Sequence, residues 1–186
     1  MKLKTLMTAT ALLGTVAIAD TMTPKAEGIS YIKMLGSTLK SELQAKMKED
    51  PTGVAAAKFC KDNAVKITKE VNSKLPEYAS VKRTALKVRN QENKPDATDD
   101  KVMSGYIEAI KAKKYNPQSA IKVVEEGDTV RVYKPLFVQK VCLKCHGTTV
   151  SPEISNLIKE GYPDDKAIDF EEGDLRGVVV AEMKKH

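Results

Sequence analysis

Apolar residues recur every three or four positions along the first third of the chain. This spacing predicts a long amphipathic helix. Its inward positions are Ile29, Ile32, Leu35, Leu39, Leu43 and Met47. Pro51 and Gly53 interrupt the pattern, and a second helical stripe that includes Cys60 follows over residues 54–71. The short break between the two stripes predicts an antiparallel helical hairpin.

The spacing of apolar residues then changes to every second position, which is the period of strands. Thr84, Leu86 and Val88 alternate with Lys or Arg residues, which is typical of a half-buried strand. Further strands are predicted over residues 120–125, 129–137 and 175–181, and the first two of these flank a turn and form a hairpin.

Two more helices are predicted between the strands. Thr98 or Asp99 can cap the first, and Ser151 followed by Pro152 begins a shorter one that ends near Gly161. Together these elements predict one α+β domain, in which the N-terminal helical hairpin packs on a small antiparallel sheet.

The first nineteen residues have the pattern of a secretory signal peptide. Lys2 and Lys4 precede an apolar run, and Ala17 and Ala19 supply the small side chains of a cleavage site. The run is shorter than the roughly 20 residues of a membrane span, and an uncleaved anchor is the alternative. We expect a signal peptide over residues 1–19, a mature domain over residues 20–186, a periplasmic location and no stable membrane insertion.

The charge balance is mildly basic. Lys and Arg number 31 against 25 Asp and Glu, which gives a formal net charge of +6. The excess is too small to predict nucleic-acid binding, although it can help docking to an acidic redox partner.

The segment from Cys142 to His146 has the pattern Cys-x-x-Cys-His, which is typical of c-type haem attachment. Two thiols on one turn of backbone can reach the two vinyl groups of one porphyrin and form thioethers. His146 then supplies the proximal nitrogen to the iron. We therefore predict one covalent haem c held by Cys142, Cys145 and His146.

Two other interpretations of this motif are weaker. A redox dithiol would leave the histidine without a role, and no thioredoxin-like βαβ unit surrounds the motif. A zinc site would need two more ligands, for which only Cys60 and His186 remain.

Cys60 is the remaining cysteine, on the inward face of the second predicted helix. The simplest interpretation is a buried structural cysteine, because free cysteine is among the most buried residue types. Coordination of iron would instead explain why a lone thiol persists in an exported protein. A third interpretation is an open or water-filled iron face that binds small gases.

Arg83 and Arg89 lie on one face of the strand predicted from the alternation. Both could meet the haem propionates as bidentate partners. The alternative is an exposed basic strand face.

Three segments together resemble the Tll0287-like family of exported single-haem sensor domains. They are Arg83–Asn90 with Asn93–Asp96, Tyr133–Leu136 leading to Cys142–Gly147, and Gly161–Ala167 with Gly173–Gly177. The resemblance implies a PAS-like sheet, with iron held by His146 on one side and by the Cys60 thiolate on the other. Residues 97–99 depart from the family pattern after Asp96, which affects only local pocket detail.

The expected function is a periplasmic haem sensor or signalling module. Reduction, or a diatomic ligand such as NO or CO, would release Cys60 and alter helix packing, and a separate redox or signalling protein would receive the signal. The alternative is a small electron-transfer cytochrome. An enzyme is not expected, because a peroxidase needs an open iron position and a distal acid–base group, and the sequence offers no distal histidine.

Overall fold

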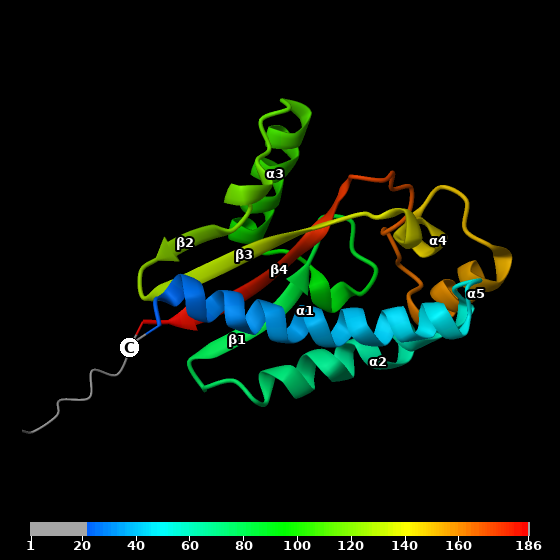
Figure 1. The fold of residues 1–186 in the computed structure, drawn as a ribbon, viewed down its shortest axis with the longest axis horizontal. Helices are drawn as coiled ribbons and strands as arrows, with labels where there is room; N and C mark the ends of the chain where they lie inside the picture. Colours follow the sequence, from blue (N-terminus) through cyan, green and yellow to red (C-terminus); the bar gives the residue numbers. More distant parts are fainter. Residues whose placement is uncertain (1–21, 186) are drawn as a thin grey trace, which may run out of the picture.

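The computed structural model describes residues 22–185 (Figure 1). The predicted signal peptide over residues 1–19 and the terminal His186 lie outside this part of the chain. Within it, five α-helices and one four-stranded antiparallel sheet confirm the α+β class and the N-terminal helical hairpin.

The hairpin consists of α1 (Pro24–Glu49) and α2 (Val54–Asn72). Thr23 caps α1 by accepting a hydrogen bond from the backbone N–H of Ala26 at 3.3 Å, and Pro24 fits the first helical position. Asp50 ends α1, and its carboxylate accepts a hydrogen bond from the Ala55 N–H at 2.9 Å, which fixes the start of α2. The two helices therefore reverse direction over four residues, as the sequence predicts.

The sheet places the first strand beside the last. Its spatial order is β1-β4-β3-β2, and each neighbouring pair is antiparallel. The strands are β1 (Ala79–Thr84), β2 (Lys122–Glu126), β3 (Thr129–Phe137) and β4 (Leu175–Lys184). The β2–β3 hairpin and the C-terminal strand confirm the predictions, and β4 continues three residues beyond the predicted end.

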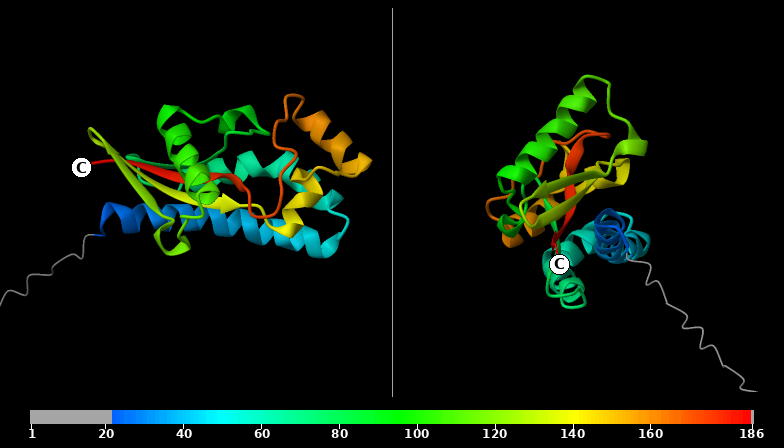
Figure 2. Two further views of the ribbon diagram at one scale, coloured as in Figure 1. Left: turned by 90° about the horizontal axis from the view of Figure 1, so that it is seen from above. Right: turned by 90° about the vertical axis from the view of Figure 1, so that its left-hand side faces the viewer.

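Alternating residues of the central strands bury both faces of the sheet. Val179, Ala181 and Met183 pack with α1, whereas Val178 and Val180 pack with α3 (Ala97–Lys111) on the opposite face. Figure 2 shows the α1–α2 hairpin and α3 on opposite sides of the strands. This two-sided burial explains the continuous apolar run in β4.

Two predictions at the ends of elements are wrong. The strand predicted from Thr84 to Val88 lies earlier, because the Thr84 hydroxyl and the Ala85 N–H both donate to the Asn93 carbonyl oxygen, at 3.0 and 3.3 Å, and this takes the chain out of the sheet. Asp96, and not Thr98 or Asp99, caps α3. Asp96 accepts from the Asp99 N–H at 2.8 Å and Asp99 accepts from the Asp96 N–H at 3.3 Å, a reciprocal capping box.

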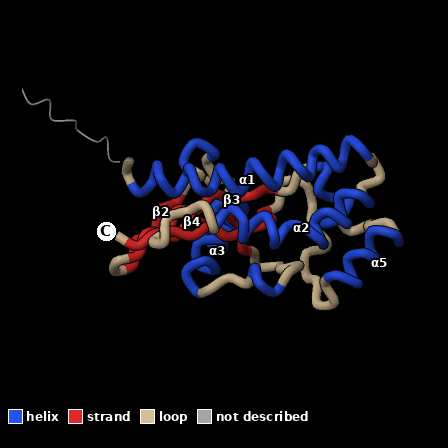
Figure 3. The backbone as a smooth tube through the Cα atoms, turned by 90° about the horizontal axis from the view of Figure 1, so that it is seen from below, coloured by secondary structure: helices blue, strands red, loops and turns tan. Residues whose placement is uncertain are grey.

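Short helices and loops cover the end of the hairpin at which α1 is connected to α2 (Figure 3). The single-turn α4 (Leu143–His146) is followed by α5 (Pro152–Gly161), whose cap at Ser151 confirms the prediction. Ile154 and Ile158 of α5 pack on Ala57 of α2. None of the helices within residues 22–185 has the length and apolar character needed to span a bilayer.

Candidate functional site

The Cys-x-x-Cys-His segment forms one tight turn beyond the end of β3. Cys142 ends a 3-10 turn (Lys140–Cys142), and α4 carries Cys145 and His146. The Gly147 N–H closes the turn by donating to the Leu143 carbonyl oxygen at 2.9 Å. A Cβ at Gly147 would lie 2.7 Å from that same oxygen, so the turn requires glycine.

The imidazole of His146 is oriented by a backbone carbonyl. Its Nδ1 lies 2.7 Å from the Ala167 oxygen, and because a carbonyl only accepts, Nδ1 carries the proton. Burial holds the pKa of His146 well below its usual value, and the positive charges of Arg176, Arg89 and Arg83 lower it further. The imidazole is therefore neutral at pH 7, and the Nε2 lone pair is available to a metal.

Cys60 of α2 and the α4 residues share the same charged neighbours. Burial raises the pKa of the Cys60 thiol, and Arg83, Arg89 and Arg176 oppose that rise. These three arginines also act on His146, so the fold brings α2 and α4 together around one cluster.

Cys60 is partly exposed, whereas its α2 neighbours Ala56, Ala57, Phe59 and Ala64 are buried. All three cysteines are free of disulfide bonds.

Cys145 lies near both other thiols. Burial is the main reason that its pKa rises to about 11, and negative charge on Cys60 or Cys142 would raise it further. Two apolar clusters flank the motif: one joins Cys145 to α5, and the other joins Cys142 to the Ala167–Phe170 segment. The thiols thus lie between apolar walls, beside the arginines.

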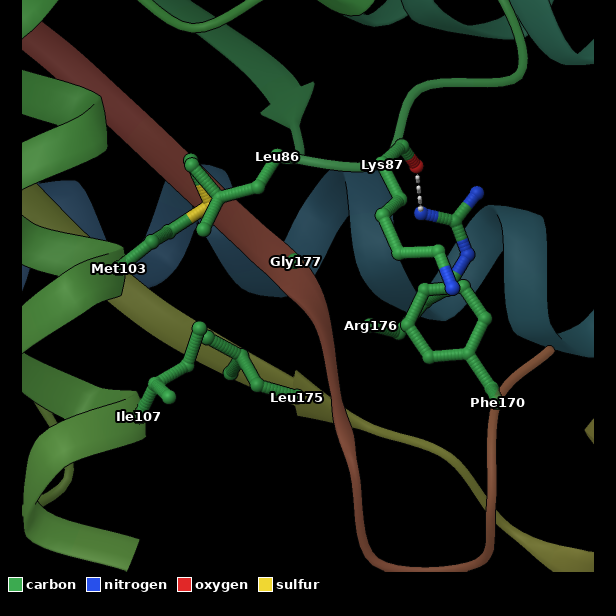
Figure 4. Close-up of a pocket in the computed structure, with 8 residues that line it drawn as sticks. All are labelled: Leu86, Lys87, Met103, Ile107, Phe170, Leu175, Arg176 and Gly177. Atoms are coloured by element: carbon green, nitrogen blue, oxygen red, sulfur yellow. Dashed lines mark hydrogen bonds between the residues drawn. The ribbon is translucent and has the colours of Figure 1, made fainter. Parts of the chain in front are cut away.

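Three partly buried arginines, Arg83, Arg89 and Arg176, converge here with one carboxylate. Among residues 22–185, Asp165 is the carboxylate that forms an ion pair with the cluster, to Arg89 at 3.0 Å. Arg176 donates to the Lys87 carbonyl oxygen at 3.2 Å (Figure 4). Burial and repulsion from Arg89 and Arg83 lower the pKa of Arg176 to about 10.

Arg83 has the least compensated charge. Its Nε is buried and has no hydrogen-bond partner in the described part of the chain, and burial lowers its pKa. An uncompensated buried cation costs free energy, so this cluster is suited to bind an anion, above all a carboxylate that can accept two guanidinium hydrogen bonds.

An aromatic residue packs against the side of the site that contains His146. Phe170 meets the His146 ring edge-on, with centroids 6.2 Å apart. The Lys87 side chain lies over the Phe170 ring (Figure 4). Lys87 Nζ is 4.4 Å from the ring centroid, and the guanidinium carbon of Arg176 is 5.4 Å from it. Beyond them, a small apolar cavity of about 110 Å³ is lined by α3 and the start of β4.

The fold brings together every described residue that the sequence singles out. Cys60, Cys142, Cys145 and His146 lie around the arginine cluster, while His186 is outside the described residues. Arg83 and Arg89 share the cluster but not a strand, because Arg89 follows the end of β1. The prediction of one strand face is therefore wrong, and so is the alternative of an exposed basic face, since the Arg89 side chain is only 13% exposed.

Sequence reasoning missed the roles of Arg176, Asp165, Ala167 and Phe170. A backbone carbonyl has no side-chain signature, so Ala167 could not be found. No group of three or more His, Cys, Asp or Glu side chains within residues 22–185 is arranged to hold a bare metal ion.

These features define an α+β protein whose neutral histidine and thiols are grouped beside partly buried arginines. The sequence model of the Tll0287-like family matches residues 8–183, and the chain belongs to this family. The solved structure described as the cyanobacterial heme-protein Tll0287 has the same fold, with a TM-score of 0.57 and 24% identity. The match covers 81% of this chain and 93% of that one. No curated protein gives a significant match.

Proposed function

We propose that this chain is a monohaem c-type cytochrome of the periplasm that acts as a redox or diatomic-gas sensor. Cys142 and Cys145 would hold the porphyrin through thioethers, and His146 and Cys60 would bind the iron from opposite sides. The observation that carries the proposal is the meeting of these four residues at a cluster of three partly buried arginines, of which Arg89 is paired with a carboxylate.

The donor set suits a haem. A neutral imidazole with Nδ1 hydrogen-bonded to a carbonyl presents Nε2 as the ligand, which is the usual arrangement at metal-binding histidines. The two thiols of the motif lie one helical turn apart between apolar walls, which suits the apolar faces of a porphyrin. The family membership and the haem protein of the same fold support the same cofactor.

The arginines suit the charged edge of a haem, which carries two propionates. Two propionates would supply the two negative charges that the cluster lacks, since Asp165 already pairs with Arg89. Arg83 and Arg176 have the fewest partners, so these two are the proposed propionate ligands.

Haem would supply iron that changes oxidation state and binds diatomic gases. Cys60 is the displaceable ligand in this proposal, because its thiolate loses affinity for iron when it is protonated, and burial already raises the thiol pKa. A thiolate also favours ferric iron, so a low reduction potential is expected.

Because Cys60 lies on α2, its release from iron would affect the elements that contact this helix. The α2 helix packs on α1 and α5, and its last residue, Asn72, hydrogen-bonds both the N–H and the carbonyl oxygen of Val81 in β1, each at 2.8 Å. Freeing Cys60 would therefore alter a helix that is tied to the sheet. A separate periplasmic protein would receive this change, and the proposed role is not enzymatic.

Visible and EPR spectra of the haem-loaded protein test the ligand assignment. The wild type should give low-spin ferric bands typical of a thiolate ligand, and Cys60→Ala should abolish them. Met34→Ala removes an exposed sulfur residue on α1 and serves as the control with unchanged spectra. An unaltered Cys60→Ala spectrum would refute the assignment.

Titration with CO and NO, with and without dithionite, separates a sensor from a carrier. A sensor should take up the gas as the thiolate signature disappears. Reversible redox cycling with no gas uptake would instead identify a small electron-transfer cytochrome.

A further inference from the structure

The Ala167 carbonyl oxygen accepts two hydrogen bonds from different elements. His146 Nδ1 donates to it at 2.7 Å, and the guanidinium of Arg89 donates to it at 3.1 Å. A carbonyl has two lone pairs, so both bonds form at once, but they share the electron density of a single oxygen.

The shared carbonyl is held in place. The Ala167 N–H donates to Asp165 Oδ1 at 2.8 Å, while Asp165 Oδ2 accepts from Arg89 at 3.0 Å. The same Nη2 of Arg89 also donates to the Cys145 carbonyl oxygen at 2.6 Å, so its two N–H groups are shared among three acceptors, and Ala167 is fully buried. Arg89 thus joins the haem-motif helix to the segment that orients His146, in a closed set of hydrogen bonds.

A charged donor on the Ala167 oxygen draws electron density from it and weakens the hydrogen bond that this oxygen accepts from His146 Nδ1. The stronger the hydrogen bond from Nδ1, the more electron-rich the imidazole becomes, and the more it stabilises ferric iron. Arg89 therefore acts against that stabilisation without touching the iron or the porphyrin.

We infer that Arg89 is a positioning residue that tunes the reduction potential through the carbonyl it shares with His146. The inference rests on the proposed haem function and adds a specific regulator of its potential. Removing Arg89 strengthens the His146 hydrogen bond and shifts the potential to more negative values.

Lys166 provides a charge control. It is an exposed cation one residue before Ala167, whereas His146 and Arg89 are the donors to the Ala167 carbonyl oxygen. Arg89→Gln and Lys166→Gln remove the same charge, and only the first frees the shared carbonyl. Arg89→Lys keeps the charge and tests the guanidinium geometry.

The first measurement uses ¹⁵N-labelled protein without haem and follows the Nδ1–H proton of His146 by NMR. His186→Gln in the background leaves one histidine and makes the assignment unambiguous. Arg89→Gln should move this resonance downfield, Arg89→Lys should move it less, and Lys166→Gln should leave it in place. A resonance that is unmoved in Arg89→Gln overturns the inference.

The second measurement is the midpoint potential of the haem-loaded variants. Arg89→Gln should shift the one-electron equilibrium toward ferric iron by about tenfold more than Lys166→Gln, which corresponds to about 59 mV. Equal shifts would mean that charge alone acts, and would overturn the inference.

The outcomes separate the two proposals. A moved resonance in a protein that never binds haem refutes the proposed function, and with it the redox role of Arg89. If Arg89→Gln does not fold, Asp165→Asn decides, because it loosens Arg89 while leaving the arginine in place. An unmoved His146 resonance in that variant also overturns the inference.

Discussion

Two charged side chains in this protein differ in whether their buried polar atoms have partners. Asp99, in the first turn of α3, is fully buried and accepts hydrogen bonds from Tyr133 Oη at 2.9 Å and from Lys82 Nζ at 2.8 Å. Arg83, next to Lys82 in β1, has a buried Nε with no partner among the described residues. Where the fold alone requires a buried charge, the charge is compensated. Where compensation is missing, the residues around it are those of the proposed haem site.

The sheet and the site are also stabilised by different kinds of contact. The sheet is held by regular strand pairing and by apolar layers on both faces. The site is held by single side-chain-to-backbone bonds, such as those from Arg89 and His146 to Ala167. The first region stabilises the fold, and the second sets the geometry of a few atoms.

The largest effect is expected from removing the compensated charge. Asp99→Ala should lower the free energy of unfolding by about 3–5 kcal/mol, because it leaves Lys82 and Tyr133 without their acceptor and removes the α3 capping box. Urea unfolding followed by circular dichroism measures this change. Asp100→Ala, at the exposed neighbouring carboxylate, is the control and should stay close to the wild type.

A change of opposite sign is expected at Arg83. Arg83→Met removes an uncompensated cation at similar volume, so it should raise the free energy of unfolding of the haem-free protein by about 1–4 kcal/mol. Arg131→Met is the contrast, since Arg131 pairs with Asp96 and Glu182, each at 2.7 Å, and its loss should destabilise. Destabilisation by Arg83→Met in urea titrations would contradict the comparison.

The pH dependence of the haem-free protein gives the next largest effect. Because the folded-state pKa of His146 lies below its unfolded value, the unfolded chain binds more protons below pH 6.5. The contribution of His146 is therefore fully present above pH 6.5 and is lost as the pH falls toward the folded pKa, by up to about 1.4 kcal/mol per pH unit. Urea titrations from pH 7.5 to pH 5 should show this slope in the wild type and a smaller one in His146→Gln.

The smallest effect concerns the cover of the His146 side. Lys87→Gln removes the cation above the Phe170 ring and should cost about 0.5–1 kcal/mol in thermal or urea unfolding. Lys166→Gln, at an exposed lysine in the segment that follows α5, is the matched control. Equal effects of the two substitutions would argue against a cation–π contribution.

The elements of the fold were largely predictable, because their signals are local. Helical spacing locates α1 and α2, and the Ser151-Pro152 pair locates α5. The β1 prediction failed because the Asn93 carbonyl, nine residues beyond Thr84, draws the chain out of the sheet, and alternation in the sequence does not record that contact.

The site was predictable where side-chain chemistry is distinctive. The Cys-x-x-Cys-His spacing and the lone Cys60 identify four residues that the fold places around one cluster. Arg176 was missed because its partners come from distant segments, and Ala167 because it acts through its backbone. Long-range packing and main-chain acceptors are the parts that spacing does not encode.

The intact mass of the purified protein, produced with a cytochrome c maturation system and denatured before measurement, tests the central claim most directly. The account predicts the mass of the processed chain plus one haem, retained after denaturation, and the mass of the chain alone when Cys142 and Cys145 are both changed to Ala. A wild-type protein that carries no haem under these conditions would contradict it.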